Sequence, residues 1–368
     1  MRLTSLSLEH FRSYDRLDLP LPECDLQLFV GCNGAGKTNL IEALTFLSVG
    51  RSCLRAEPSD ALRWGEDFFR IRANTLSDAG EASGLEYVWQ RTPRKQSALF
   101  IRDVRTPLLQ FIGALPTIVF LPQDLDIFTG APSHRRTFLD MLLSQLKPDF
   151  AANRIEYERI LKQRNAVLSA IGDGMAGLDD LALWDSRLAS KAARLIFLRE
   201  EVIQLFGRHM EKNIRSLGEA TWTDAFLIHD RKTTAETVEA IEEEMTRLLL
   251  DSRNRDLALR TTTVGPHRDD WHLRALGRDI AVFASRGQQR SAFIALLLTS
   301  ATLFQDVRGE RPVILLDDVL SELDESHQKS LLSSLEDHQV FITTTHPVTM
   351  AGESALWNVS GGTVTISS

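Results

Sequence analysis

The residues with the clearest chemistry are Gly31-Cys32-Asn33-Gly34-Ala35-Gly36-Lys37-Thr38, which match the phosphate-loop pattern G-x-x-x-x-G-K-[ST] without a mismatch. Glycines in such a loop let backbone N–H groups curl around an anion, and the helix that follows adds the positive end of its dipole. Lys37 would reach the outer phosphates of a nucleotide, and the Thr38 hydroxyl would ligate Mg²⁺. A glycine-rich turn that merely precedes a lysine is the alternative.

The flanks of this loop supply the structural context that the pattern requires. Apolar and other residues alternate over residues 25–30, as in a strand, and apolar residues recur at helical spacing over residues 40–47. A strand, a glycine-rich turn and a helix start are the elements that hold a phosphate. The flanks therefore favour nucleotide binding over a chance turn.

A second group of candidate residues ends the apolar run Val313–Leu316, which is typical of a strand covered on both faces of a parallel sheet. Asp317 and Asp318 follow it, at the carboxyl end where ligands bind in open α/β sheets. We expect Asp317 to hold the Mg²⁺ shell and Asp318 to polarise an attacking water. A solvated acidic turn after the strand is the alternative.

Three further candidate site segments lie directly before or after predicted strands and helices. Gln123 comes after a predicted strand over Thr117–Leu121, and His346-Pro347 ends the expected last core strand, over Val340–Thr345. A histidine in that place can lie beside the γ-phosphate and sense its loss. The run Ser285-Arg286-Gly287-Gln288 precedes an apolar helix, which we expect to be buried because it is apolar on every side.

Composition limits the class of protein. The chain has 368 residues, of which 43% are hydrophobic, and a net charge of −8. It is thus no generally basic nucleic-acid coat, and any DNA contact must come from a local positive face. No signal peptide or membrane-spanning run is recognisable. The three cysteines, Cys24, Cys32 and Cys53, lack metal-ligand spacing, so a reducing cytosol is the simplest setting.

The pattern of elements predicts an α/β head over residues 1–124 and 257–368, interrupted by a helical lobe over residues 125–256. In the head we expect a nucleotide-binding sheet with an added antiparallel layer. In the lobe we expect helices no longer than about 25 residues and no long coiled coil. The expected elements are strands over 68–76, 85–91, 98–101, 258–264 and 271–276, and helices over 136–145, 153–170, 181–205 and 237–250.

The order of these motifs resembles that of ABC-type ATPase heads. Ser285–Gln288 is similar to the family's signature motif, which contacts the γ-phosphate of a partner subunit. Ser321-Glu322-Leu323-Asp324 resembles the D-loop at the subunit interface. Gln123 and His346 resemble the Q-loop glutamine and the switch histidine. The resemblance implies that two copies enclose ATP, with Ser285, Gly287 and Gln288 supplied by the other copy.

Within that superfamily the chain resembles the RecF family of bacterial recombination mediators over nearly its full length. The runs that carry this closer match are Phe11–Tyr14, Leu121–Leu125, Pro132 with Arg135–Asp140, Gly265-Pro266-His267-Arg268-Asp269-Asp270 and Ser285–Arg290. The resemblance implies ATP-driven homodimerisation on gapped DNA, weak DNA-stimulated hydrolysis, the partners RecO and RecR, and roles in replication, repair and the SOS response. It also makes Arg12 a candidate nucleotide ligand. Arg286 departs from transporter heads, which carry glycine there.

Two related classes fit less well. SMC-type ATPases place several hundred residues of coiled coil between the two halves of the head, whereas about 130 residues of short helices are expected here. Transporter ATPases have the signature motif about a hundred residues after the phosphate loop, whereas Ser285 lies much further from Thr38.

For DNA contact the candidates are basic clusters in the lobe. Arg187, Lys191 and Arg194 share one face of a helix at i, i+4 and i+7. Arg159, Lys162 and Arg164 form a second cluster, and Arg135-Arg136 a third. A solvated face is the alternative for each, because the lobe carries about as many acids as bases. An ATPase head that serves a protein complex without touching DNA therefore stays open as a second function.

Overall fold

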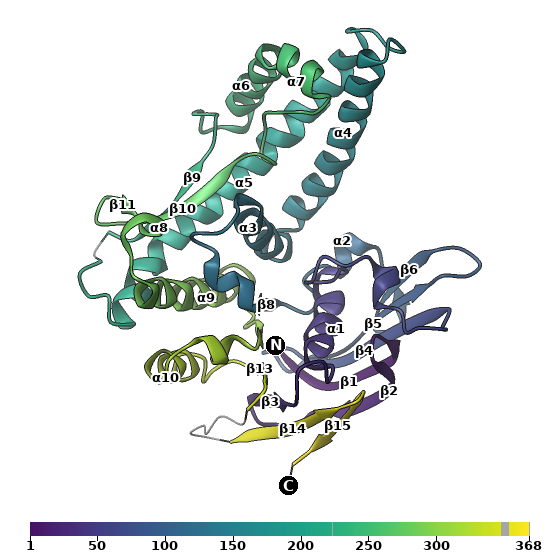
Figure 1. Cartoon of the computed structure of the whole chain (residues 1–368), viewed down its shortest axis with the longest axis vertical. Helices are drawn as coiled ribbons and strands as arrows, with labels where there is room; N and C mark the ends of the chain where they lie inside the picture. Colours follow the sequence, from purple (N-terminus) through teal and green to yellow (C-terminus); the bar gives the residue numbers. More distant parts are fainter. Residues whose placement is uncertain (223, 347–352, 368) are drawn as a thin grey trace. The chain divides into compact units, whose positions relative to one another are not determined.

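A computed structural model describes residues 1–222, 224–346 and 353–367 of the chain. The chain forms two compact units (Figure 1). Unit 1 comprises Met1–Ile127, Lys212–Thr221 and Ala284–Ser368, and unit 2 comprises Phe128–Glu211 and Trp222–Phe283. Among the described residues, no helix is long and apolar enough to cross a membrane.

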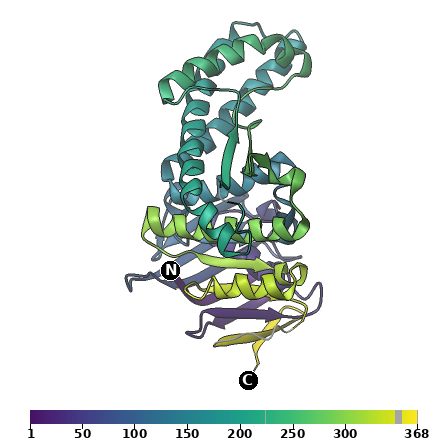
Figure 2. The same cartoon turned by 90° about the vertical axis from the view of Figure 1, so that its left-hand side faces the viewer.

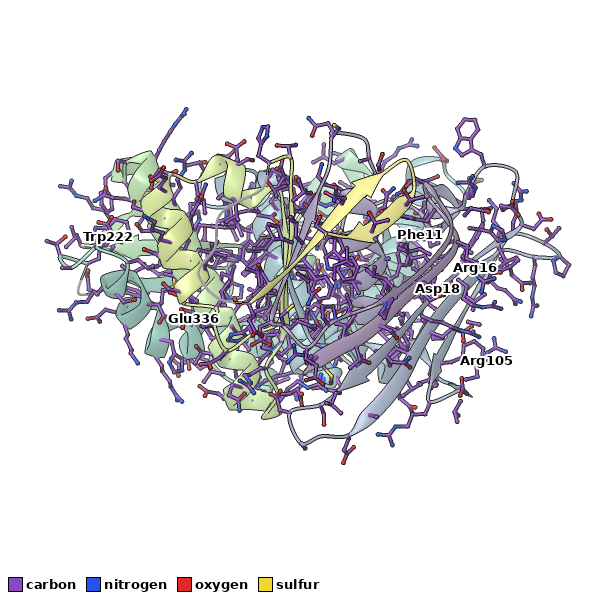
Figure 3. All side chains as sticks on the ribbon, turned by 90° about the horizontal axis from the view of Figure 1, so that it is seen from below. Phe11, Arg16, Asp18, Arg105, Trp222 and Glu336 are labelled. Carbon is purple, nitrogen blue, oxygen red and sulfur yellow. The ribbon has the colours of Figure 1, made fainter. Side chains whose placement is uncertain are left out.

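Unit 1 contains an antiparallel sheet in the strand order β2-β1-β4-β5-β6-β7. Its inward residues alternate with polar ones, as a sheet with one solvated face requires. Phe11, labelled in Figure 3, is fully buried, whereas Arg16 and Asp18 on β2 are exposed and paired at 3.2 Å. The strands are β1 (Arg2–Phe11), β2 (Tyr14–Pro20), β4 (Phe68–Leu76), β5 (Ala82–Gln90), β6 (Gln96–Ile101) and β7 (Val104–Arg105).

A second sheet of unit 1 has the order β15-β14-β3-β13-β12-β8. Its five neighbouring strands from β14 to β8 run parallel, and β15 pairs antiparallel with β14. The strands are β3 (Leu26–Val30), β8 (Thr117–Phe120), β12 (Val313–Asp317), β13 (Val340–Thr344), β14 (Ser354–Ser360) and β15 (Thr363–Ile366). All five residues of β12 are buried, which confirms a strand covered on both faces.

Helix α1 (Lys37–Val49) packs against strands of both sheets, with β4 and β5 from one and β12 and β13 from the other. Phe46 of this helix meets Phe11, Phe69 and Tyr87 in an aromatic cluster. The core therefore fixes the helix that begins at the phosphate loop. The remaining helices of unit 1 are η1 (Pro58–Ala61), α2 (Leu108–Phe111), η2 (Pro122–Asp126), α9 (Arg286–Arg308), η3 (Val319–Glu322) and α10 (Glu325–Ser333).

Unit 2 is mainly helical, with α4 and α5 side by side (Figures 1 and 2). It also carries a small sheet in the order β11-β10-β9. Its elements are α3 (Pro132–Leu146), α4 (Pro148–Gly172), α5 (Asp180–Ser216, its end in unit 1), β9 (Phe226–Asp230), α6 (Val238–Asp251), α7 (Arg253–Leu259), β10 (Asp270–Ala275), β11 (Arg278–Asp279) and α8 (Ile280–Phe283).

Three expectations from the sequence were wrong. Helix α5 has 37 residues rather than about 25, because the helix continues through Gly207 with buried Phe206 and Met210 on either side. No strand forms over residues 258–264, where α7 ends at Leu259 and Asp256 binds the Thr263 backbone N–H. The strand at 340–344 is not the last core strand, since β14 joins the same sheet.

Candidate nucleotide site

Four neighbouring parallel strands end at one edge of the second sheet and carry the predicted site residues. In sheet order they are β3, β13, β12 and β8. The phosphate loop follows β3, His346 follows β13, Asp317 and Asp318 end β12, and Gln123 follows β8. The parallel register therefore brings together groups that lie up to about 315 residues apart in the chain.

The phosphate loop has the backbone conformation that its glycines permit. Gly34 and Gly36 have φ values of 79° and 109°, which side chains rarely adopt. At Gly31, an added Cβ would lie 2.3 Å from the Val359 carbonyl oxygen, so no larger residue fits. Cys32, Asn33 and Gly34 are exposed, whereas Ala35 is half-buried. The loop thus presents its tip to solvent on a fixed base.

Lys37 and Thr38 begin α1 directly after this loop. The Lys37 ammonium is buried and donates to the carbonyl oxygens of Gly31 and Cys32 at 2.7 and 3.1 Å. The Thr38 hydroxyl lies 2.9 and 3.1 Å from the two carboxylate oxygens of Asp317. The lysine charge and the hydroxyl–carboxylate pair therefore border the same loop.

Asp317 is held by two threonines. Thr343 on β13 donates its hydroxyl proton to Asp317 Oδ1, opposite the contact from Thr38. Burial raises the pKa of Asp317, and the neighbouring Asp318 raises it further, against the two hydroxyl hydrogen bonds and Lys37. A cation at this carboxylate would offset that burial. A hydroxyl and a carboxylate in contact are also the hard oxygen donors that Mg²⁺ prefers, so the pair fits the ion.

Asp318 has a different environment from Asp317. It lies just past β12 with φ at 50°, and its backbone N–H donates to Thr343 Oγ1 at 3.0 Å. Its Oδ1 atom is buried and has no hydrogen-bond partner within the described ranges. A buried acceptor without a donor is costly, so the strained backbone presents a carboxylate oxygen that can accept from a water.

Gln123 and His346 are both exposed, at the ends of their strands. The segment after β8 folds into the 3₁₀ helix η2, in which the Leu121 backbone N–H donates to Asp124. Burial raises the pKa of Asp124 to about 6. His346 donates its backbone N–H to Thr344 Oγ1 at 3.3 Å. Pro347, which follows it, lies outside the described residues.

The D-loop residues have local structural partners. The Ser321 hydroxyl donates to the Asp318 carbonyl oxygen at 2.7 Å, and Asp324 caps α10 by accepting from the backbone N–H groups of Ser326 and His327. Hydrogen bonds from Ser326 and His327 hold the pKa of Asp324 below its usual range. Both side chains belong to exposed residues, so they can also face a second molecule.

The signature-like motif begins α9 as a capping box. Ser285 Oγ accepts from the Gln288 backbone N–H at 3.3 Å, and the Gln288 side chain accepts from the Ser285 backbone N–H at 3.0 Å. Gln288 Nε2 donates to the Glu219 carboxylate at 3.0 Å. Ser285 and Arg286 are exposed, and Gly287 is half-buried. The motif is therefore on the surface of unit 1 rather than inside it.

Arg12 forms a paired fork with Glu42 on α1, with both N···O distances at 2.7 Å. Glu42 is fully buried and also accepts from Ser52. The neighbouring residues Ser13 and Tyr14 touch the loop, since the Tyr14 hydroxyl donates to the Gly36 carbonyl oxygen at 3.0 Å. Arg12 thus anchors the turn beside the loop, and its contact with a nucleotide stays a prediction.

Sequence reasoning missed several supporting residues of the site. Thr343 and Glu42 carry no motif of their own, because each acts through a contact with a residue elsewhere in the chain, Asp317 and Arg12 respectively. The threonines that end the otherwise apolar strand β13 offered a weak signal, since buried hydroxyls at a strand end need a partner.

The Gly265–Asp270 run lies within unit 2 as part of a buried polar network. Asp270 pairs with Arg135 through two hydrogen bonds of 2.7 and 2.8 Å, and Arg199 donates to the Pro266 carbonyl oxygen at 2.6 Å. His267 is in contact with the Tyr157 hydroxyl. Burial lowers the pKa of His267 to about 4. These motif residues hold unit 2 together.

The basic clusters are mostly paired. Arg164 is fully buried between Asp185 and Asp256, and Arg135 is buried, so neither can lie on an open DNA-binding face, contrary to expectation. Lys191 pairs with Glu156 at 2.6 Å, and Arg194 pairs with Asp149. Arg187 is exposed and lies over the Trp184 ring.

Comparisons with known proteins agree with this arrangement. A family profile described as an AAA domain matches residues 5–91. The chain is 34% identical to a DNA replication and repair protein RecF from Heliobacterium modesticaldum, covering 94% of this chain and 93% of the relative. It is 32% identical to the protein of that name from Streptococcus agalactiae, covering 100% and 98%.

Solved structures give the same result for the fold. A structure of the recombination mediator protein RecF with ATP, described as in the RecFOR pathway, superposes with a TM-score of 0.89 at 29% identity, covering 100% of this chain and 98% of that one. An Smc head bound to part of ScpA superposes with a TM-score of 0.58 at 15% identity over 100% of this chain and 97% of the other, which bears on the fold alone. The expected fold of an ABC-type ATPase head is confirmed, and the chain belongs to the RecF family.

Proposed function

We propose that this chain is an ATP-dependent recombination mediator, in which ATP binding assembles a homodimer on DNA and slow hydrolysis releases it. The observation that carries the proposal is the contact between Thr38 and Asp317 at the edge of the parallel sheet. It joins the two halves of a phosphate and metal site in one unit. The solved relative described with ATP supports the choice of nucleotide.

Each site residue has a role in this proposal. Backbone N–H groups of the loop from Gly31 to Gly36 bind the phosphates, and the Lys37 ammonium, now on two loop carbonyls, turns to the outer phosphates. Thr38 and Asp317 hold Mg²⁺, with Gln123 as a further candidate ligand. When bound, the ion supplies positive charge where the phosphates develop negative charge.

Hydrolysis depends on Asp318 and His346. The unpartnered Asp318 oxygen accepts a hydrogen bond from the attacking water and orients it towards the γ-phosphate. His346, exposed at the end of β13, reports whether that phosphate is present. The Asp318 Oδ1 atom has no hydrogen-bond donor within the described residues, and the second copy must complete the site before hydrolysis. Both features are consistent with slow turnover in a molecular switch.

The second copy supplies the other half of the charge cage. Ser285 and Arg286 are exposed at the start of α9, where the helix dipole favours an anion. Ser285, Gly287 and Gln288 then face the γ-phosphate held by the partner copy, and Ser321 and Asp324 line the interface. Loss of the γ-phosphate removes these contacts and opens the dimer.

The proposed contact with DNA and the proposed partners RecO and RecR are inferred from the relatives. The full-length relatives are named DNA replication and repair proteins, and the solved relatives are described as mediators in the RecFOR pathway. We extend this to DNA-stimulated hydrolysis on gapped DNA, a role in the SOS response, and a cytoplasmic location. Arg187, Lys191 and Arg194 are the proposed phosphate contacts.

A second function keeps some support. Two of those three bases are already paired with acids of α4, which favours an ATPase head that serves a protein complex without DNA contact. Duplex and gapped DNA added to an ATPase assay separate the two. Stimulation supports the mediator, and equal rates with every DNA form support the alternative.

The dimer is tested by light scattering with and without ATP. Lys37→Ala should abolish ATP binding and dimerisation, because it removes the charge that holds the outer phosphates. Asp318→Ala should still dimerise with ATP but should not hydrolyse it. Dimers of Lys37→Ala that form without ATP would contradict the proposal.

A further inference from the structure

Trp64 is the most exposed aromatic residue in the protein. Its exposed fraction is 98%, and of the Phe, Tyr and Trp residues only Phe226 of unit 2 is also exposed. Four other tryptophans, Trp89, Trp222, Trp271 and Trp357, are at most 5% exposed. An indole that meets almost nothing of its own chain leaves both ring faces open for a ligand.

The segment that carries Trp64 is tied to the turn beside the phosphate loop. Leu62 forms a β-bridge with Phe11, and the Arg63 backbone N–H donates to the His10 carbonyl oxygen at 2.9 Å. The Arg63 guanidinium donates to the Ser13 carbonyl oxygen, also at 2.9 Å. Trp64 thus follows a residue whose side chain reaches that turn.

Ser13 in turn borders the loop and the first turn of α1. Asn39 Nδ2 donates to Ser13 Oγ at 3.0 Å, and a Cβ added at Gly36 would lie 2.7 Å from the same oxygen. Ser13 thus connects the loop and the first turn of α1 to Arg63, the residue before Trp64.

The backbone at Trp64 forms a hydrogen-bonded turn. The Glu66 backbone N–H donates to the Arg63 carbonyl oxygen at 3.2 Å, and Gly65 has φ at 92°. These are features of a type II turn, in which the glycine occupies the third position. Trp64 occupies the second position, at the outer corner of the turn.

The direction of a bound nucleotide follows from Lys37. A phosphate-loop lysine reaches the β- and γ-phosphates, and the Lys37 ammonium lies against the carbonyls of Gly31 and Cys32 at the beginning of the loop. The nucleoside therefore leaves towards the first turn of α1, where Asn39 binds Ser13. That is the side on which the Arg63–Glu66 turn is attached.

We propose that the Trp64 indole stacks on the base of the nucleotide held by the phosphate loop. The inference rests on the proposed nucleotide binding and adds the residue that binds the base. Stacking on an aromatic side chain accepts any base with a π face, so the contact should add affinity with little base specificity.

The test uses the full-length protein, with Mg²⁺, ATP and inorganic tripolyphosphate as probes. Loss of one base-stacking contact corresponds to about 5- to 150-fold weaker binding. We expect Trp64→Ala to weaken ATP binding within this range in titration calorimetry, and Trp64→Phe to recover part of it. Binding of tripolyphosphate should be unchanged. ATP, but not tripolyphosphate, should quench the exposed tryptophan fluorescence of the wild type, and Trp184→Phe should leave that quenching intact.

Two results would overturn the inference alone. One is wild-type ATP affinity in Trp64→Ala, and the other is an equal loss of ATP and tripolyphosphate, which would indicate a damaged loop. An unchanged ATP affinity with weaker ATP-driven dimerisation would assign Trp64 to the contact between copies. If the wild type bound ATP no better than Lys37→Ala, the proposed function itself would fail.

Discussion

Thr38 and Asp317 are 279 residues apart in the chain, yet the threonine hydroxyl lies 2.9 Å from one carboxylate oxygen and 3.1 Å from the other. Thr38 begins α1, whose position is fixed by two sheets, and Asp317 ends a strand that is buried along its length. The pair is thus set by the core of unit 1. A buried carboxylate in this position reduces stability until a cation binds it.

Asp317→Asn should separate stability from function. Because burial raises the pKa of Asp317, the ionised group destabilises the nucleotide-free fold once the pH exceeds the folded pKa. The amide removes that charge, so we expect an unfolding free energy higher by up to about 1 kcal/mol. Mg²⁺-dependent ATP binding should be lost. Thermal melting and calorimetry check both, and a lower melting temperature without ligand would contradict the argument.

Arg12→Ala should destabilise the protein before it affects any ligand. It would leave the fully buried Glu42 carboxyl without its paired fork, which costs about 3 kcal/mol. The double variant Arg12→Leu with Glu42→Leu should recover much of this loss. If Arg12 also binds nucleotide, the folded double variant should still bind ATP weakly. An ATP affinity equal to that of the wild type would show that Arg12 has a structural role only.

The sequence predicted those parts of the site that are written in short runs. The phosphate loop and the Asp317 strand were recognisable because strand, loop and helix patterns are local. The order of strands in the sheet was not recognisable, since no local pattern indicates that β13 lies between β3 and β12. The partners Thr343 and Glu42 depend on that order and on the packing of α1.

Charge patterns were the weakest guide. Arg164 and Arg187 look alike in sequence, because each belongs to a cluster of basic residues on a predicted helix. In the structure, Arg164 is buried between two aspartates, whereas Arg187 is exposed. The difference arises from acids on other elements. Helix length failed for a similar reason, because tertiary burial of Phe206 and Met210 outweighs the low helix propensity of Gly207.

The proposed DNA face can be tested by freeing its cations. Asp149→Asn with Glu156→Gln removes the acids that pair with Arg194 and Lys191. If that face binds DNA, the double variant should bind duplex DNA more tightly, and the slope of log affinity against log salt should steepen by about 2. Arg187→Ala, Lys191→Ala and Arg194→Ala together should weaken binding without altering ATP-driven dimerisation. Unchanged DNA affinity in both variants would reject this face.

Asp269 and Asp270 are neighbours in the chain with opposite expected pH dependence. Burial raises the pKa of Asp269 to about 6, despite attraction from His229, Arg199 and Arg231. Its Oδ2 atom has no hydrogen-bond partner within the described ranges, and His229 Nε2 lies 3.8 Å from it. Burial also opposes ionisation of Asp270. The hydrogen bonds from Arg135 and from the Trp271 backbone N–H, together with the charges of Arg135 and His272, outweigh it and hold the Asp270 pKa below its usual range.

The two pKa shifts have opposite effects on stability as the pH changes. The folded pKa of Asp269 exceeds its unfolded value of about 3.9, so its charge destabilises the fold fully above pH 6 and not at all below about pH 4. Asp269→Asn should therefore raise the melting temperature at pH 8, corresponding to about 3 kcal/mol, and this gain should vanish by pH 4. The Arg136 contact to the backbone carbonyl of residue 269 is retained.

Asp270→Asn is the matched control in the same network. The charge of Asp270 stabilises the fold above its unfolded pKa, and Arg135 would be left buried without its ion pair, so the variant should lose about 3 kcal/mol at pH 8. The loss should shrink as the pH falls below 4, since the wild-type carboxylate then takes up a proton. Melting followed by intrinsic tryptophan fluorescence between pH 4 and 8 measures both variants. Parallel curves for the two variants would contradict the opposite roles assigned to these carboxylates.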